Sequence, residues 1–146
     1  MMEELLAVLS EQGCESRVVP VEHLADIRAE YERRLGEGLI DPGLRESYLS
    51  DFSFSPPARQ PEARSIIVVA VPQPQYQVTF NWDGEPLQAA VPPTYPERLM
   101  DRQVGQLLRQ VLEPAGYWLA DALLPKKLLA VRSGLAAYGK NNITYV

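Results

Sequence analysis

The stretch from Gly134 to Asn142 combines residue types that suit the binding of a polar ligand. Glycines at 134 and 139 permit positive φ and let the backbone approach a ligand closely. Lys140 adds a cation, and Asn141 and Asn142 add amide donors, so the segment can bind a phosphate or the amide groups of a corrinoid. The same pattern also fits a plain helix cap followed by a turn that directs a strand. The residue types leave both interpretations open.

Residues that ligate metals are scarce in this chain. It contains one cysteine, Cys14, and one histidine, His23. A single cysteine excludes an internal disulfide and fits a reducing compartment. One cysteine and one histidine also cannot form an all-nitrogen and sulfur zinc site or ligate a complete iron–sulfur cluster. We therefore assign no metal ligand, and we expect Cys14 to have a structural role.

Length and composition are those of a soluble globular domain. The chain has 146 residues, of which 46% are hydrophobic and 23% charged. No apolar run reaches the roughly 18 residues that a membrane-spanning helix needs. The N-terminus carries acidic residues where a signal peptide would carry basic ones, so we expect a cytoplasmic protein without membrane contact.

The distribution of charge separates the C-terminal part of the chain from the rest. The net charge of −5 argues against a surface that binds nucleic acid as a whole. Beyond Asp121, however, the sequence has no acidic residue, whereas Lys126, Lys127, Arg132 and Lys140 follow. This basic stretch suits a phosphate-bearing cofactor or an RNA, and it equally suits a solvated helix face.

Hydrophobic periodicity and turn residues predict an α/β (α+β) fold, with a small mixed β-sheet flanked by helices. A capping-box pattern at Thr94 and Glu97 opens the longest predicted helix, which continues to Leu112. The continuous β-branched run at 65–71 predicts a strand buried on both faces, and Asp83-Gly84 predicts a hairpin turn. The other predicted helices cover residues 2–12, 22–35, 42–49 and 125–133, and the other strands cover 17–21, 78–82, 87–91, 117–120 and 143–146.

The proline-rich segment 53–64 is interpreted as an ordered connector within one domain, anchored by Phe52 and Phe54. Residues 1–146 are therefore expected to form a single N-terminal α/β domain. The chain ends in the apolar strand pattern ITYV, which is typical of a truncated domain. An unpaired edge strand at 143–146 would favour self-association of the fragment.

Three segments, in the expected order, resemble the epoxyqueuosine reductase family and its ferredoxin-like relatives, which carry two [4Fe–4S] clusters. The segment LLAVRSGLAAYGKNNITYV (128–146) is similar to their helix–glycine turn–strand motif, A-x-x-[AS]-G-L-x-x-x-G-[KR]-N. The segment ARSIIVVAVP (63–72) resembles their first core strand, and PPTY (92–95) is similar to a feature of the ferredoxin-like relatives. The resemblance implies that this chain is the N-terminal portion of such a protein and precedes its cluster-binding domain.

The resemblance also implies cofactors and site residues. The full-length protein would carry [4Fe–4S] clusters and base-off cobalamin, although this fragment would hold no cofactor itself. The implied cofactor-binding residues are Gly134, Tyr138, Gly139, Lys140, Asn141 and Asn142.

A carboxylate protonates the substrate in the family, and Asp121 lies close to that position. The surrounding LADALLPKK departs from the family's usual sequence. A general acid must reach the group that it protonates, and its pKa must be raised by burial. The apolar stretch before Asp121 favours burial, whereas a helix N-cap or a surface turn is the alternative.

The sequence thus predicts the N-terminal domain of an oxidoreductase that transfers electrons from iron–sulfur clusters to a corrinoid or to an organic substrate. Its partners would be a C-terminal iron–sulfur domain of the same chain and a small-molecule or tRNA-borne substrate. The alternative is a non-catalytic scaffold or partner-binding domain of an electron-transfer protein. A pocket lined by Asp121, Lys140 and Asn141 would favour the enzyme, and a flat surface at these residues would favour the scaffold.

Overall fold

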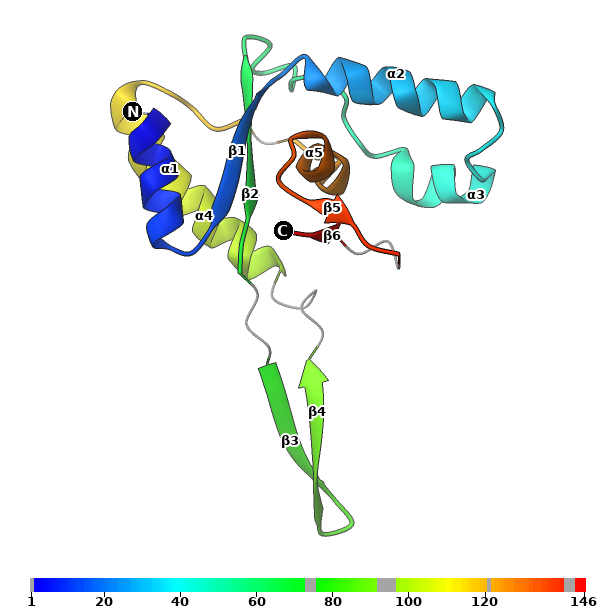
Figure 1. The fold of residues 1–146 in the computed structure, drawn as a ribbon, viewed down its shortest axis with the longest axis vertical. Helices are drawn as coiled ribbons and strands as arrows, with labels where there is room; N and C mark the ends of the chain where they lie inside the picture. The colour runs from blue at the N-terminus through cyan, green and yellow to red at the C-terminus, as the bar shows by residue number, and fades with distance from the viewer. Residues whose placement is uncertain (1, 73–75, 92–96, 121, 141–143) are drawn as a thin grey trace. The chain divides into compact units, whose positions relative to one another are not determined.

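The structure, a computed structural model, describes residues 2–72, 76–91, 97–120, 122–140 and 144–146 (Figure 1). Helices and small antiparallel sheets make up the described chain, which confirms the predicted α+β class. The strands form three two-stranded antiparallel sheets rather than one mixed sheet. The chain divides into two compact units: unit 1 is Met1–Cys14 with Val71–Leu119, and unit 2 is Glu15–Ala70 with Ala120–Val146.

Two helices form the core of unit 1. Helix α1 (Met2–Glu11) contacts helix α4 (Glu97–Leu112). Leu5 and Leu9 of α1 are completely buried, and Leu108 and Leu112 of α4 are buried as well. Each pair is spaced i, i+4, so its two side chains lie on one stripe of their helix. The predicted capping residue Thr94 lies outside the described residues.

Helix α4 continues into the 3-10 turn η2 (Glu113–Ala115), which ends at Gly116 in the left-handed conformation. The predicted strand at Tyr117–Ala120 is wrong, because this segment forms no ladder with any described strand. The Tyr117 amide instead donates to the Leu112 carbonyl (3.0 Å) and so closes the helix end. The aromatic side chains that suggested a strand, Tyr117 and Trp118, are exposed.

The β-hairpin of unit 1 follows the sequence pattern closely. Strands β3 (Tyr76–Trp82) and β4 (Glu85–Val91) pair antiparallel around Asp83 and Gly84. Both turn residues have positive φ (50° and 86°), the geometry of a type I′ turn. Among the described strands no third one joins this pair, which agrees with the edge position that Pro86 predicts.

The main sheet of unit 2 consists of β1 (Glu15–Pro20) and β2 (Ser65–Ala70), paired from Glu15↔Ala70 to Pro20↔Ser65. The expectation that β2 is buried on both faces is wrong, because Ile66 alone is buried and most other positions are partly exposed. A two-stranded antiparallel sheet gives β2 no second neighbouring strand. The β-branched composition of β2 therefore reflects strand propensity more than a central position in a sheet.

The core of unit 2 lies between this sheet and two helices, α2 (His23–Gly36) and α5 (Lys126–Arg132). Its buried residues are Val19, Leu24, Ile27, Ile66 and Leu129. The ring of Phe54 packs against this cluster and stacks on Tyr31, with ring centroids 5.4 Å apart. Phe54 therefore anchors the proline-rich segment, as the sequence predicts.

The remaining elements of unit 2 are short. Helix α3 (Pro42–Leu44) continues as the π-helical turn η1 (Arg45–Leu49). The side chain of Asp41 accepts a hydrogen bond from the Leu44 amide (2.9 Å), which confirms the N-cap that the Asp41-Pro42 pair predicts. Strand β5 (Ala137–Tyr138) pairs antiparallel with β6 (Thr144–Tyr145). The strand predicted at the end of the chain is thus present and has a partner.

Candidate functional site

The glycine turn that suggested a ligand site begins with a complete helix C-cap. Ser133 caps α5, and Gly134 follows with φ of 72°. The Leu135 amide donates to the Ala130 carbonyl (3.0 Å), and the Gly134 amide donates to the Val131 carbonyl (3.1 Å). These two bonds form a Schellman motif, which requires a left-handed residue at the position of Gly134. Since Leu135 is buried directly after the turn, Gly134 has a structural role in aiming the chain.

Three other predicted site residues, Tyr138, Gly139 and Lys140, follow this cap consecutively in the sequence. Tyr138 lies in β5 opposite Thr144 of β6, and 43% of its surface is exposed. Gly139 is half-buried, and Lys140 is exposed in the turn that follows. This short segment therefore offers a phenol and an ammonium group to a ligand or to a neighbouring protein surface. Asn141 and Asn142, the two amide donors of the predicted site, lie outside the described residues.

The predicted general acid, Asp121, also lies outside the described residues. The neighbouring side chains Ala120, Ala122 and Leu123 are exposed, and the strand expected before Asp121 is absent. The apolar strand that favoured burial of Asp121 therefore gives that role no support.

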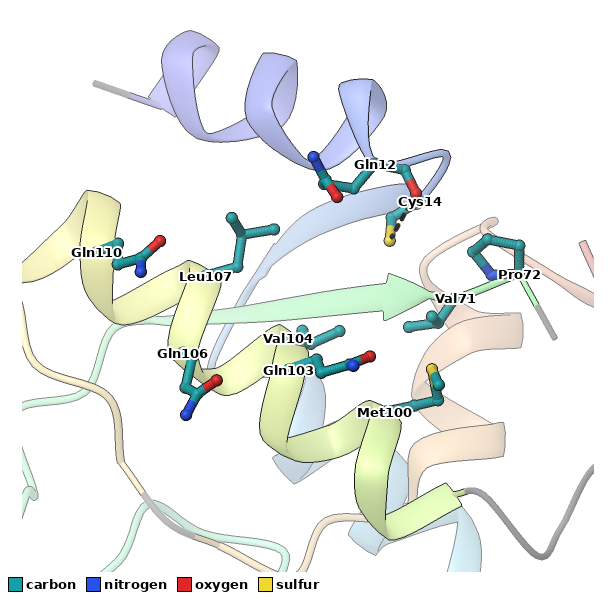
Figure 2. A pocket seen from close by; sticks show the side chains of 10 residues that line it. All are labelled: Gln12, Cys14, Val71, Pro72, Met100, Gln103, Val104, Gln106, Leu107 and Gln110. Atoms are coloured by element: carbon teal, nitrogen blue, oxygen red, sulfur yellow. Dashed lines mark hydrogen bonds between the residues drawn. The ribbon is translucent and has the colours of Figure 1, made fainter. Parts of the chain in front are cut away.

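A cavity in unit 1 was not predicted from the sequence. It has a volume of about 470 Å³, within the range of small-molecule sites. Figure 2 shows it between the end of α1 and one face of α4. Its lining residues are Gln12, Cys14, Val71, Pro72, Met100, Gln103, Val104, Gln106, Leu107 and Gln110. None of these is a predicted site residue.

The cavity has a neutral lining with amide groups among apolar side chains. Gln103, Gln106 and Gln110 recur at i, i+3 and i+7 along α4, so they share one helix face. This spacing beside the apolar stripe of α4 is the sequence signal that could have identified the cavity. An uncharged lining suits a neutral ligand or the packing of a further segment better than a phosphate.

Cys14 lines this cavity but lacks the environment of a reactive thiol. Its side chain is buried, and its Sγ donates weakly to the Gln12 carbonyl at 3.9 Å. Burial raises the pKa of the Cys14 thiol, which reduces the thiolate fraction at neutral pH. The predicted structural role of Cys14 agrees with this environment.

The described ranges contain no group of three histidine, cysteine, aspartate or glutamate residues arranged to hold a metal ion. Among the described helices none is long and apolar enough to cross a membrane. Comparison of the chain with protein-family models, with curated proteins and with solved structures found no match.

Proposed function

We propose that this chain is the N-terminal portion of an iron–sulfur redox protein similar to epoxyqueuosine reductase. In the full-length protein, a C-terminal domain would bind the [4Fe–4S] clusters, because this sequence has a single cysteine. Electrons would pass from the clusters to a corrinoid or to an organic substrate, either a small molecule or a tRNA-borne base. The protein would act in the cytoplasm.

One observation carries this proposal. The segment that resembles the family motif contains a helix, a glycine turn and a strand in the order of the motif: α5, Gly134 and β6, with the short strand β5 paired to β6. Beyond the turn, the exposed side chains of Tyr138 and Lys140 are available for contact with a cofactor or with the C-terminal domain. The chain supplies donors that fit the amide fringe of cobalamin, and Asp121 is retained as the candidate acid.

The cofactor role of the turn is tested in the full-length protein, which first requires the coding sequence downstream of Val146 to be determined. We expect two cysteine-rich runs there, and stoichiometric iron in protein purified without oxygen. Lys140→Ala should leave the melting temperature unchanged, because an exposed lysine contributes within about 0.5 kcal/mol to folding. The same variant should retain less cobalamin through gel filtration, because it removes the cation beside the predicted amide donors.

Lys127→Ala is the matched control, since Lys127 is an exposed lysine on α5 outside the predicted binding set. Equal cobalamin retention in both variants and in the wild type would reduce the turn to a structural element. A stop codon directly after Val146, or a downstream sequence without cysteine runs, would remove the redox proposal altogether.

The second candidate function is a scaffold or partner-binding domain of an electron-transfer protein. The observation that favours it is the amount of exposed apolar surface on the β3–β4 hairpin, where Phe80 and Trp82 are 45% and 65% exposed. A wild-type full-length protein that holds clusters yet turns over no substrate would favour this candidate, whereas turnover in the wild type that is lost in Asp121→Asn would favour the enzyme.

A further inference from the structure

The β3–β4 hairpin has one apolar face and one polar face. Side chains alternate along a strand, so Tyr76, Val78, Phe80 and Trp82 of β3 lie on the same face. The residues directly opposite on that face of β4 are Val91, Ala89, Leu87 and Glu85. The other face carries Gln77, Thr79, Asn81 and Gln88, together with Pro86 and Ala90. We call the first face the apolar hairpin face. Its apolar residues are Tyr76, Val78, Phe80, Trp82, Leu87, Ala89 and Val91, and Glu85 lies at its tip.

Solvent covers the apolar hairpin face in the monomer. Five of its large side chains are substantially exposed: Tyr76 by 46%, Val78 by 49%, Phe80 by 45%, Trp82 by 65% and Leu87 by 44%. Single exposed apolar residues are common on protein surfaces, but a contiguous apolar patch usually marks an interaction site. A two-stranded hairpin is also only marginally stable alone in water and needs packing on one face. The pattern therefore calls for a surface that covers this face.

The charges on the hairpin narrow the choice of the surface that covers it. The hairpin carries two acidic residues, Asp83 and Glu85, at its tip, and it has no basic residue from Tyr76 to Val91. This excludes the basic character that a nucleic-acid interface needs. The rest of the apolar hairpin face is uncharged, so it can pack against an identical face without opposing like charges. In a two-fold arrangement with the hairpins antiparallel, the two acidic tips lie at opposite ends of the interface.

The exposed area gives the size of such a contact. A large aromatic side chain offers about 200 Å² for burial, so three half-exposed rings contribute roughly 300 Å² per copy. With Val78 and Leu87 the face would bury roughly 450 Å² per copy, or about 900 Å² in a dimer. This total lies just below the roughly 1,000 Å² of a stable specific interface and in the range of weak, reversible ones.

We propose that the apolar hairpin face is the interface of a reversible two-fold dimer of this chain. The two hairpins pack face to face, and Phe80 and Trp82 of each copy cover the apolar residues of the other. The dimer is independent of the redox proposal, because it rests on unit 1 alone and requires no cofactor. It also differs from edge pairing, since the strand edges of the hairpin remain free in this arrangement.

The test measures sedimentation velocity over a concentration series and compares the wild type with two variants. The wild type should pass from monomer to dimer as its concentration rises. Phe80→Gln, on the apolar hairpin face, should raise the dissociation constant at least tenfold. Thr79→Gln, one residue away on the polar face, should dimerise as the wild type does. A wild type that stays monomeric at every concentration overturns the proposal, as does equal behaviour of the two variants.

A second measurement does not depend on the folding of any hairpin variant. Trp118→Phe leaves Trp82 as the single tryptophan. Because Trp82 is 65% exposed in the monomer, its emission should shift to shorter wavelength as this protein dimerises. Dimerisation without a shift would place the interface elsewhere and would overturn the proposal.

Discussion

At the scale of single residues, Gly134 is the position where sequence and structure agree most directly. Its φ of 72° is favourable for glycine and strained for a residue with a β-carbon. Gly134→Ala should therefore lower the free energy of unfolding by about 1 kcal/mol, measured by urea denaturation. No atom lies within 4 Å of the added β-carbon, so the loss would come from backbone strain and not from a clash.

Gly36→Ala is the matched control for this experiment. Gly36 is helical, at the end of α2, and its added β-carbon would also meet nothing within 4 Å. Alanine in a helix is more favourable than glycine by up to about 1 kcal/mol, so this variant should be as stable as the wild type or more stable. Equal destabilisation by both variants would contradict the strain argument.

Local chemistry explains which residues could be predicted from the sequence. The Asp41 cap, the Asp83-Gly84 turn and the Gly134 helix stop each depend on backbone preferences of the residues themselves. The cavity between α1 and α4 depends on how two segments distant in sequence pack together. Its glutamines look like ordinary surface residues in the sequence, so no single residue type predicted the cavity. The binding role of Tyr138 and Lys140 stays a prediction, because a binding site likewise depends on how distant segments pack together.

At the scale of elements, helix α2 has a network of charged side chains on its exposed surface. Glu30 accepts hydrogen bonds from Arg33 (2.9 Å) and Arg34 (2.6 Å), and Arg33 also pairs with Glu37 (2.6 Å). The hydrogen bonds that Arg33 and then Arg34 donate to Glu30 lower the pKa of its carboxyl group to about 2. The bonds that Arg33 donates to Glu30 and Glu37 raise the pKa of Arg33. The pairs are solvent-exposed, so each adds little to stability.

A pH dependence follows from the lowered pKa of Glu30. Between about pH 4.5, where an ordinary glutamate titrates, and pH 2, the unfolded chain binds a proton at this position that the folded chain does not. The stabilising contribution of Glu30 is therefore fully present above this window and is lost as the pH falls through it. The stability difference between the wild type and Glu30→Gln should shrink over the same window, as followed by urea denaturation at each pH.

Salt provides the control for this prediction. Because the pairs are exposed, added salt should screen them and reduce the stability difference between the two proteins at neutral pH. A carboxyl carbon signal of Glu30 that titrates at the ordinary value in an NMR experiment would contradict the network seen on α2.

Element types were predictable where the periodicity was long and where turn residues marked both ends. The helices and the hairpin have such signals, and the structure confirms them. Apart from the single mixed sheet, the two errors concern short apolar runs. Residues 65–71 and 117–120 both look like strands from their β-branched and aromatic side chains, but strand burial and strand existence depend on partners. With β1 as its single neighbour among the strands that the structure describes, β2 remains partly exposed. Without any partner among the described strands, residues 117–120 do not form a ladder.

At the scale of the whole molecule, the chain passes between the two units more than once. Unit 1 consists of the start of the chain and its middle, and unit 2 consists of the segments between and after them. Each unit has a small set of buried apolar residues: Leu5, Leu9, Cys14, Leu108 and Leu112 in unit 1, and the Val19 to Leu129 cluster in unit 2. Cores of this size supply only a few kcal/mol each. The sequence-based prediction of a single domain thus becomes a prediction about cooperativity.

Because neither unit is a continuous chain with a large core, we expect the two to unfold in one transition. Both tryptophans, Trp82 and Trp118, belong to unit 1, so tryptophan fluorescence reports unit 1 alone, whereas far-ultraviolet circular dichroism reports the helices of both units. The two urea unfolding curves should coincide within error. Leu129→Ala, a core truncation in unit 2 expected to cost about 2–5 kcal/mol, should then shift the fluorescence curve of unit 1 as far as the circular dichroism curve. If Leu129→Ala shifts only the circular dichroism curve, the two units are separate folding domains and the single-domain prediction is wrong.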